Sequence, residues 1–263
     1  MYAVEYQRAK SVADAAAALA KSDGKALAGG QSLVGAMKLR LANPGTVVDL
    51  SGIAELKGIR KEGDAIVIGA LTTHAEVAAS PVVKQAIPAL AALADGIGDR
   101  QVRNRGTIGG SIANSDPAAD YPAAVLGLNA TVQTNKRKIA ADDFFKGLYE
   151  TALAADEIIT AVSFPISKKA AYVKFPQPAS RFALVGVFVA QTGGGVRVAV
   201  TGAGSHAHRA KAIEDALAKS FTPDAAKAVR IPADHLNNDI HGSAEYRAHL
   251  VSVLAGRAVA AMT

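Results

Sequence analysis

The chain has 263 residues, of which half are hydrophobic and a fifth are charged, and its formal net charge is +6. This length can bury a substantial core and suggests one large or two modest domains. The absence of cysteine excludes disulfides, thiolate catalysis and an iron–sulfur cluster held by this chain. No apolar run approaches the roughly 18 residues that cross a bilayer, and no secretory signal is visible, so we expect no membrane span and a cytoplasmic location.

The positive charge raises the question of nucleic acid binding. The basic residues are scattered along the chain, tryptophan is absent, and no Lys/Arg-rich tract is interleaved with aromatic residues. We therefore expect no nucleic acid partner and interpret the charge as suited to an anionic cofactor or an acidic partner protein.

The first 50 residues are predicted to form a small βαβ unit, in which short apolar runs alternate with helical patterns. Ser11 with Asp14 resembles a capping box, and the sequence Asn43-Pro44-Gly45 ends a helix. The predicted elements are a helix from Ser11 to about Lys21, a strand over Lys25–Ala28, a helix over Leu33–Leu41 with Leu33, Met37 and Leu41 on one face, and a strand over Thr46–Leu50.

The pattern then changes to mixed strands and helices, which indicates an α+β fold. A polar, lysine-containing link near residue 168 suggests two domains, residues 1–168 and 169–263. The predicted elements are a hairpin of Ile59–Lys61 with Ala65–Ile68, helices that begin at Thr73 and at Ser80, a helix end or restart at Pro88, strands over Asp156–Pro165, Ala183–Gln191 and Val196–Thr201, and helices over Ala210–Lys219 and Ala244–Ala261.

A pair of glycines lies at residues 28–33, in the sequence AGGQSL, between a predicted strand and a predicted helix. The unpaired N–H groups of such a junction favour phosphate, and glycine lets a pyrophosphate approach the backbone without a Cβ in the way. An ordinary tight turn is the more frequent explanation of a single Gly-Gly pair, so this stretch alone does not establish a phosphate site.

A second glycine pair occurs in TIGGSIAN, residues Thr107–Asn114. Arg100, Arg103 and Arg105 precede it, and Asp120 follows it. Hydroxyl and free N–H groups suit phosphate oxygens, and a carboxylate such as Asp120 suits ribose hydroxyls or an adenine amine. Two similar motifs predict one extended anionic ligand, with bare backbone N–H groups in both motifs.

Other motifs in the chain are weaker. GAGSHA at Gly202–Ala207 matches a dinucleotide-binding fingerprint, but Asp224, at the position of its acidic residue, falls in a loop and helix start rather than after a strand. GQSLVG at Gly30–Gly35 is one residue longer than a nucleophile elbow, and no triad partners accompany it. His206 and His208 lack a nearby cysteine or carboxylate cluster, so we expect no metal site.

Four stretches together resemble the FAD-binding (medium) subunit of molybdenum hydroxylases, a group that includes carbon monoxide dehydrogenase, xanthine dehydrogenase and related aldehyde or N-heterocycle oxidoreductases. These stretches are AGGQSLVGAMKLRLA, IGALTTHAEV, IGDRQVRNRGTIGGSIANSDPAADYPAA and HGSAEYRAHLVSVLAGRA. The resemblance implies a flavin domain of the vanillyl-alcohol-oxidase type, made of two α+β subdomains. A small C-terminal domain with an antiparallel sheet and helices would follow it.

The resemblance also implies which residues bind FAD. The pyrophosphate would meet both glycine motifs, Asn114 and Asp120 would lie around the adenosine half, and Ile97 would pack near the isoalloxazine. Ile159 and Lys174 match further flavin contacts, and Lys174 would stabilise the reduced flavin if it faces the pyrimidine side. The implied set is Ala28, Gly29, Gly30, Gln31, Ser32, Leu33, Ile97, Thr107, Ile108, Gly109, Gly110, Ser111, Asn114, Asp120, Ile159 and Lys174.

The resemblance implies an electron-transfer role. A large subunit would oxidise substrate at a molybdenum cofactor, and a small subunit would relay electrons through [2Fe–2S] clusters to FAD on this chain, in a dimer of heterotrimers. FAD would be noncovalent, because cysteine is absent and neither glycine motif contains histidine. No catalytic residue is expected on this chain. A self-contained flavin oxidoreductase and a flavin-free scaffold are the alternatives, and substrate and terminal acceptor are open.

Overall fold

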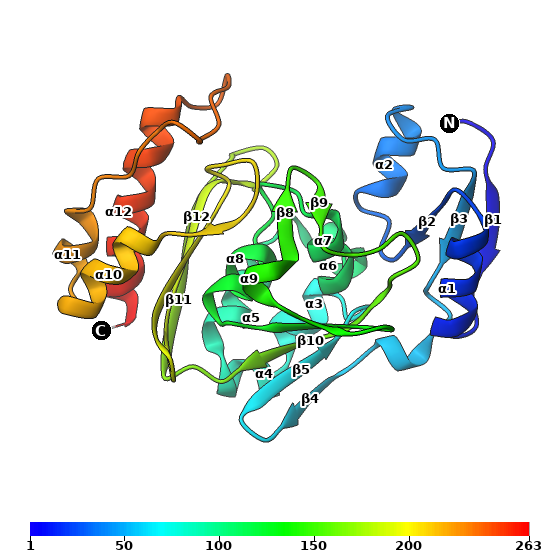
Figure 1. The fold of residues 1–263 in the computed structure, drawn as a ribbon, viewed down its shortest axis with the longest axis horizontal. Coiled ribbons are helices and arrows are strands. Elements are labelled where there is room, and N and C mark those ends of the chain that lie inside the picture. Colours follow the sequence, from blue (N-terminus) through cyan, green and yellow to red (C-terminus); the bar gives the residue numbers. More distant parts are fainter. Residues whose placement is uncertain (263) are drawn as a thin grey trace.

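The computed structural model describes residues 1–262 and confirms the α+β class expected from the sequence. The three larger sheets follow one another along the chain, with three, five and four strands, and a fourth sheet has two strands. In Figure 1 the N-terminal sheet lies at the right, the central sheet lies in the middle, and the C-terminal sheet with its helices lies at the left. Each of the three larger sheets contributes to its own cluster of buried apolar residues.

The N-terminal sheet is parallel, with strand order β1-β3-β2, as a βαβ unit requires. The Ser11 side chain accepts a hydrogen bond from the Asp14 N–H group (3.1 Å) and caps the first helix, as expected. The elements are β1 (Glu5–Arg8), α1 (Val12–Lys21), β2 (Gly24–Leu27), α2 (Leu33–Lys38) and β3 (Thr46–Asp49), followed by a 3-10 turn at Ala54–Leu56.

The helix predicted over Leu33–Leu41 is shorter than expected. It ends at Lys38, and Leu41 lies outside it with 79% of its surface exposed. The N–H group of Leu41 turns back to the carbonyl of Ala36, and Arg40 takes a left-handed conformation with φ of 61°. The predicted apolar face is therefore wrong at Leu41, because the helix has already ended there.

The central sheet is antiparallel, with strand order β4-β5-β10-β6-β7. Thr73 and Glu76 form the predicted capping box, and Ser80 and Pro88 begin helices. The strands are β4 (Ile59–Glu62), β5 (Ala65–Gly69), β6 (Thr131–Thr134), β7 (Lys138–Ala140) and β10 (Ile159–Pro165), with a small pair β8 (Phe145–Gly147) and β9 (Glu150–Thr151). The helices are α3 (His74–Ala79), α4 (Pro81–Ala86), α5 (Pro88–Asp95), α6 (Arg100–Arg105), α7 (Ile108–Asn114), α8 (Tyr121–Gly127) and α9 (Ala141–Phe144).

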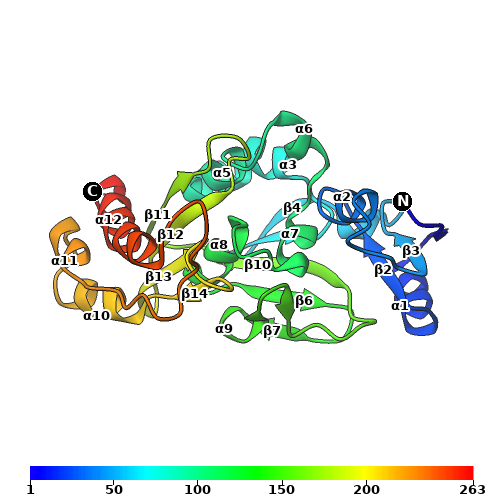
Figure 2. The ribbon, with the colours of Figure 1, turned by 90° about the horizontal axis from the view of Figure 1, so that it is seen from above.

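The C-terminal sheet lies between the central part and a layer of helices (Figure 2). Strand β12 is buried on both faces: Phe188 and Ala190 belong to the central core, whereas Val185, Val187 and Val189 belong to the C-terminal core. The elements are β11 (Lys169–Pro176), β12 (Ala183–Thr192), β13 (Gly195–Thr201), β14 (His208–Arg209), α10 (Lys211–Lys219), α11 (Pro223–Lys227) and α12 (Ala244–Met262). Among residues 1–262, no helix is both long and apolar enough to cross a membrane.

Charged side chains reinforce the contact between the C-terminal sheet and the central part. Arg197 on β13 donates to the Leu126 carbonyl (2.8 Å) and pairs with Asp142. Arg209 on β14 also reaches Asp142 (3.1 Å) and pairs with Glu214 (2.6 Å). Burial alone would raise the pKa of Glu214, but hydrogen bonds from Arg209 and Lys211 hold that pKa below its usual value.

Phe188 should contribute much of the stability of this interface. It is fully buried, and a Cβ on Gly127 of α8 would come within 2.6 Å of its ring. We expect Phe188→Ala to lower the free energy of unfolding by about 3–5 kcal/mol, because it removes apolar contacts and leaves a cavity. Denaturant unfolding measures this loss. The control is Phe175→Ala, since Phe175 is 39% exposed; equal losses for the two variants would contradict the proposed packing.

Candidate cofactor-binding site

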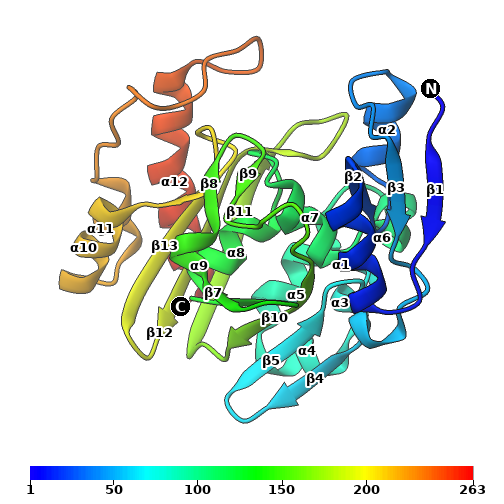
Figure 3. The ribbon, with the colours of Figure 1, turned by 45° about the vertical axis from the view of Figure 1, so that its right-hand side comes forward.

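The fold brings the two glycine motifs into contact although they lie far apart in the sequence. A Cβ on Gly29 would lie 2.0 Å from the carbonyl oxygen of Arg105, just before the second motif. A Cβ on Gly110 would lie 3.5 Å from the Cβ of Ala28. Helix α2 begins at the end of the first motif, and helix α7 includes the glycine pair of the second. The two helices lie near each other in Figure 2, and Figure 3, in which α1 comes forward, shows the N-terminal unit beside the central part. The expected convergence of the two motifs is thus present.

The first motif carries a run of free backbone donors. Within residues 1–262, none of the N–H groups of residues 29–33 makes a hydrogen bond, and the next one, Val34, bonds to the Gly30 carbonyl (3.2 Å). Gly30 has φ of 80°, which a residue with a side chain adopts only with strain. Successive free N–H groups around a left-handed residue form an anion-binding nest.

The second motif differs from this expectation, because its glycine pair lies in the first turn of α7 and the N–H groups of residues 108–111 are already bonded. Thr107 caps this helix. The bonds run from Ile108 to the Thr72 carbonyl (3.1 Å), from Gly109 to the Ala70 carbonyl (2.8 Å), from Gly110 to Thr107 Oγ1 (3.2 Å) and from Ser111 to the Thr107 carbonyl (3.0 Å). Bare N–H groups were expected in both motifs, and that expectation is wrong for the second one. The half-buried side chains of Ser111 and Asn114 make no hydrogen bond within the described chain.

Asp120, at the start of α8, lies against Lys174 of β11. The Lys174 Nζ is 2.9 Å from Asp120 Oδ1, and the Tyr172 hydroxyl donates to the same carboxylate (2.6 Å). Asp120 is 4% exposed. Burial raises its pKa, and the charge of Lys174 and the hydrogen bond from Tyr172 oppose that rise. The carboxylate is therefore part of a buried ion pair rather than a free acceptor.

This pair limits the roles that the resemblance implies. Asp120 was expected near the adenosine half of FAD and Lys174 at the flavin. The two side chains are in direct contact, whereas the pyrophosphate separates adenosine from the ring in FAD. The two side chains therefore lie at one and the same part of the site, so a separate adenosine contact for Asp120 and flavin contact for Lys174 do not fit this arrangement.

The two remaining predicted residues, Ile97 and Ile159, are apolar and differ from each other in their surroundings. Ile97 is half-buried just after α5, next to the carbonyl of Gly96 that accepts from Lys174 (2.9 Å). Ile159 is 5% exposed and belongs to the central apolar core, in register with Thr134. Ile159 thus has the surroundings of a core residue.

His74, at the start of α3, is a part of this region that sequence reasoning missed. A Cβ on Gly106 would lie 2.5 Å from its Nε2, so the imidazole supports the chain just before the second motif. Burial, with a smaller effect of the Arg103 charge, lowers the pKa of His74 to about 4. Its Nδ1 and the Tyr121 hydroxyl are buried without a hydrogen-bond partner in the described chain, and their rings are 5.3 Å apart. The only signal in the sequence is its place in IGALTTHAEV.

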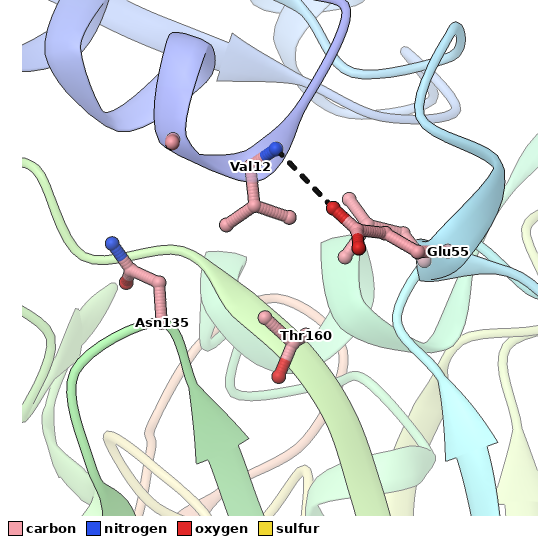
Figure 4. Close-up of a pocket in the computed structure, with 6 residues that line it drawn as sticks. Val12, Glu55, Asn135 and Thr160 are labelled. Atoms are coloured by element: carbon pink, nitrogen blue, oxygen red, sulfur yellow. Dashed lines mark hydrogen bonds between the residues drawn. The ribbon is translucent and has the colours of Figure 1, made fainter.

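Two concave regions lie outside the predicted set of residues. One, of about 420 Å³, is shown in Figure 4 between the start of α1 and the central sheet; there the Val12 N–H group faces Glu55 (3.5 Å), and Asn135 and Thr160 line the opposite side. The other, of about 570 Å³, is a groove over α3, α5 and α6. Neither is lined by a predicted FAD-binding residue.

The nest of free donors fits a protein that binds an anionic cofactor, and comparison with known proteins identifies its family. Residues 2–167 match the family described as the FAD binding domain in molybdopterin dehydrogenase. The chain belongs to this family, and FAD is the cofactor that the family binds.

Full-length relatives agree with this assignment. The chain is 39% identical to the nicotine 6-hydroxylase medium subunit of Paenarthrobacter nicotinovorans, over 98% of this chain and 96% of the relative. It is 37% identical to the carbon monoxide dehydrogenase medium chain of Hydrogenophaga pseudoflava, over 97% and 95%. A solved structure of carbon monoxide dehydrogenase from Hydrogenophaga pseudoflava superposes with a TM-score of 0.91 at 38% identity, covering 99% of this chain and 97% of that one. The relatives are subunits of oxidoreductases, which confirms the class expected from the sequence.

The contact between the two motifs should depend on Gly29. We expect Gly29→Ala to cost about 1–3 kcal/mol of folding stability, because its methyl group would overlap the Arg105 carbonyl. Gly35→Ala on α2 is the matched control: its Cβ meets nothing within 4 Å, and alanine should stabilise the helix by about 0.5–1 kcal/mol. Thermal melting of both variants checks this, and a harmless Gly29→Ala would show that the backbones are not in contact.

His74 should make stability sensitive to acid. The unfolded state takes up a proton near pH 6.5, whereas the native state keeps His74 neutral until about pH 4, so stability falls as the pH drops through this interval. At about 1.4 kcal/mol per pKa unit, the loss is on the order of 3 kcal/mol. We expect His74→Gln to remove this part of the pH dependence and the exposed His249→Gln to leave it. Denaturant unfolding at pH 6.5 and pH 4 measures the change in unfolding free energy for the wild type and both variants. An equal change in all three proteins would show that His74 is not the source of the pH dependence.

Proposed function

We propose that this chain is the FAD-carrying electron-transfer subunit of a heteromeric molybdenum-dependent dehydrogenase or hydroxylase. The observation that carries the proposal is the run of five free N–H groups at residues 29–33 in a chain of this family. When bound, FAD can take up and release electrons singly or in pairs. The chain itself would bind and orient the cofactor and would supply no acid–base catalyst.

The residues of the first motif fit the anionic part of FAD. Free donors stabilise a pyrophosphate without a change in the fold, and the left-handed Gly30 shapes the nest. We propose that Ala28–Leu33 hold the pyrophosphate. Thr107–Ser111 would form the wall opposite, with the free side chains of Ser111 and Asn114 as the polar contacts of that wall. Ile97, Asp120 and Lys174 would belong to another part of the same site.

The partners are proposed from the relatives. Several relatives are named as medium chains, which implies large and small partner chains in those enzymes. We propose that this chain receives electrons from [2Fe–2S] clusters of a small subunit, that a large subunit carries the molybdenum cofactor, and that two such heterotrimers associate. The terminal acceptor would be external. Residues 1–168 would be the flavin domain and 169–263 the C-terminal domain, and a cytoplasmic location stays a prediction.

The visible spectrum of the purified chain tests the assignment. We expect bound or readily acquired FAD with flavin absorbance, released intact by denaturation because the linkage is noncovalent. Gly110→Val should lose FAD, since its side chain would project between the two motifs towards Ala28. Gly35→Ala should keep it. A wild-type chain that stays colourless with added FAD would refute the proposal. Full flavin content in Gly110→Val would show that FAD does not lie between the two glycine motifs.

A further inference from the structure

The segment Gly96–Gly98, between α5 and α6, has an unusual set of hydrogen bonds. Each of its three successive carbonyl groups accepts from a cationic side chain. Lys174 donates to Gly96 (2.9 Å), Arg103 donates to Ile97 and to Gly98 (3.0 Å each), and Arg181 donates to Gly98 (3.2 Å). Cations suit this place because the carbonyls at the C-terminal end of a helix carry partial negative charge.

The cations come from distant parts of the chain. Arg103 is on α6 next to the segment, whereas Lys174 and Arg181 belong to β11 and to the loop that follows it. Lys174 has three donor hydrogens, and its three partners are the Gly96 carbonyl, the Asp120 carboxylate and the Arg181 carbonyl (2.8 Å). All three donor hydrogens thus have acceptors within the protein, and these bonds hold the ammonium group between residues 96–98, Asp120 and the loop after β11.

The segment is connected to the second motif through α6. Asp99, the next residue, caps α6 by accepting from the Val102 N–H group (2.8 Å). That six-residue helix ends at Arg105, whose carbonyl lies against Gly29 of the first motif. A shift of residues 96–98 would thus pass through one short helix to the contact between the two motifs.

We propose that Lys174, balanced by Asp120, is a positioning residue for the cofactor site: it fixes residues 96–98, and through α6 the Arg105–Gly29 contact, from a strand in the C-terminal part of the chain. This inference rests on the proposed function. It gives Asp120 the role of the anion that holds Lys174 in place.

The test compares FAD affinity with stability in purified full-length variants, by fluorescence titration, thermal melting and visible circular dichroism of bound FAD. We expect Lys174→Met to weaken FAD binding by about tenfold or more and to change the flavin circular dichroism, and Lys174→Arg to restore most of both. The double variant Asp120→Asn/Lys174→Met should bind no more weakly than Lys174→Met, because residues that act as a unit are not additive.

Two controls separate positioning from general loss of stability. Arg247→Met removes another buried cation of the C-terminal part, which donates to the Leu184 and Gly202 carbonyls (2.8 and 2.9 Å) and does not touch residues 96–98. It should lower the melting temperature yet keep the wild-type affinity for FAD. Lys169→Met, an exposed change on the same strand as Lys174, should alter neither.

The outcomes separate the two claims. Wild-type affinity in Lys174→Met, or an equal loss of affinity in Arg247→Met, would overturn the positioning role and leave the proposed function standing. If Lys174→Met is too unstable to measure, Arg181→Met removes only one exposed donor to the Gly98 carbonyl, and it should weaken FAD binding in the same direction by a smaller factor. Unchanged affinity in Arg181→Met would then overturn the inference. Failure of the wild-type chain to bind FAD would instead overturn the proposed function.

Discussion

The structure depends on the close approach of two stretches of backbone, at Gly29 and at Arg105–Gly106. No side chain fits between them, since a Cβ on Gly29 would lie within 2.9 Å of three backbone atoms of that pair. The contact joins the N-terminal parallel sheet to the helices of the central part, and it places the free donors of residues 29–33 beside the start of α7. Because main-chain atoms form the contact, a side chain at position 29 could be accommodated only by moving one backbone away from the other.

The C-terminal sheet is fixed to the central part of the molecule because it packs on both of its faces. One face of β12 adds Phe188 and Ala190 to the central core, and the other face packs against the C-terminal helices. A sheet held in this way carries Lys174 and Tyr172 to the start of α8 and the end of α5. The C-terminal part therefore does more than cover the flavin domain: its side chains complete hydrogen bonds of the segment that leads into the second motif.

Local chemistry explains which features could be predicted from the sequence. Ser11, Thr73 and Pro88 begin helices as expected, because caps and prolines act within one turn. The hairpin of β4 and β5 and the two long C-terminal strands were also predicted. Strand β11 was not, although Tyr172 and Lys174 lie on it. Its polar and small residues give no clear strand pattern in the sequence, because the strand is stabilised by its pairing with β12 and its packing against α5 and α12.

In the candidate site, too, local features could be predicted from the sequence and contacts between distant residues could not. The glycine motifs are visible in the sequence, but the partners of their N–H groups are not. Ile108 and Gly109 bond to Thr72 and Ala70, more than 35 residues away in the chain, so a motif that looks open in the sequence is closed in the fold. Asp120 and Lys174 were each identified from the resemblance, and only the fold shows that they bind each other, 54 residues apart.

The two Gly-Gly pairs therefore have different physical roles in spite of their similar sequences. In the first pair, Gly29 permits the contact with Arg105 and Gly30 supplies a left-handed backbone. In the second pair, Gly109 packs against Ala70, where a Cβ would lie 2.6 Å from the alanine methyl group, and Gly110 faces Ala28. The first motif has a run of successive free backbone donors, whereas in the second motif the N–H groups of residues 108–111 are bonded within the protein. An anion held between the motifs would thus take its main-chain hydrogen bonds from residues 29–33, while α7 would shape the space and contribute side-chain hydroxyl and amide groups.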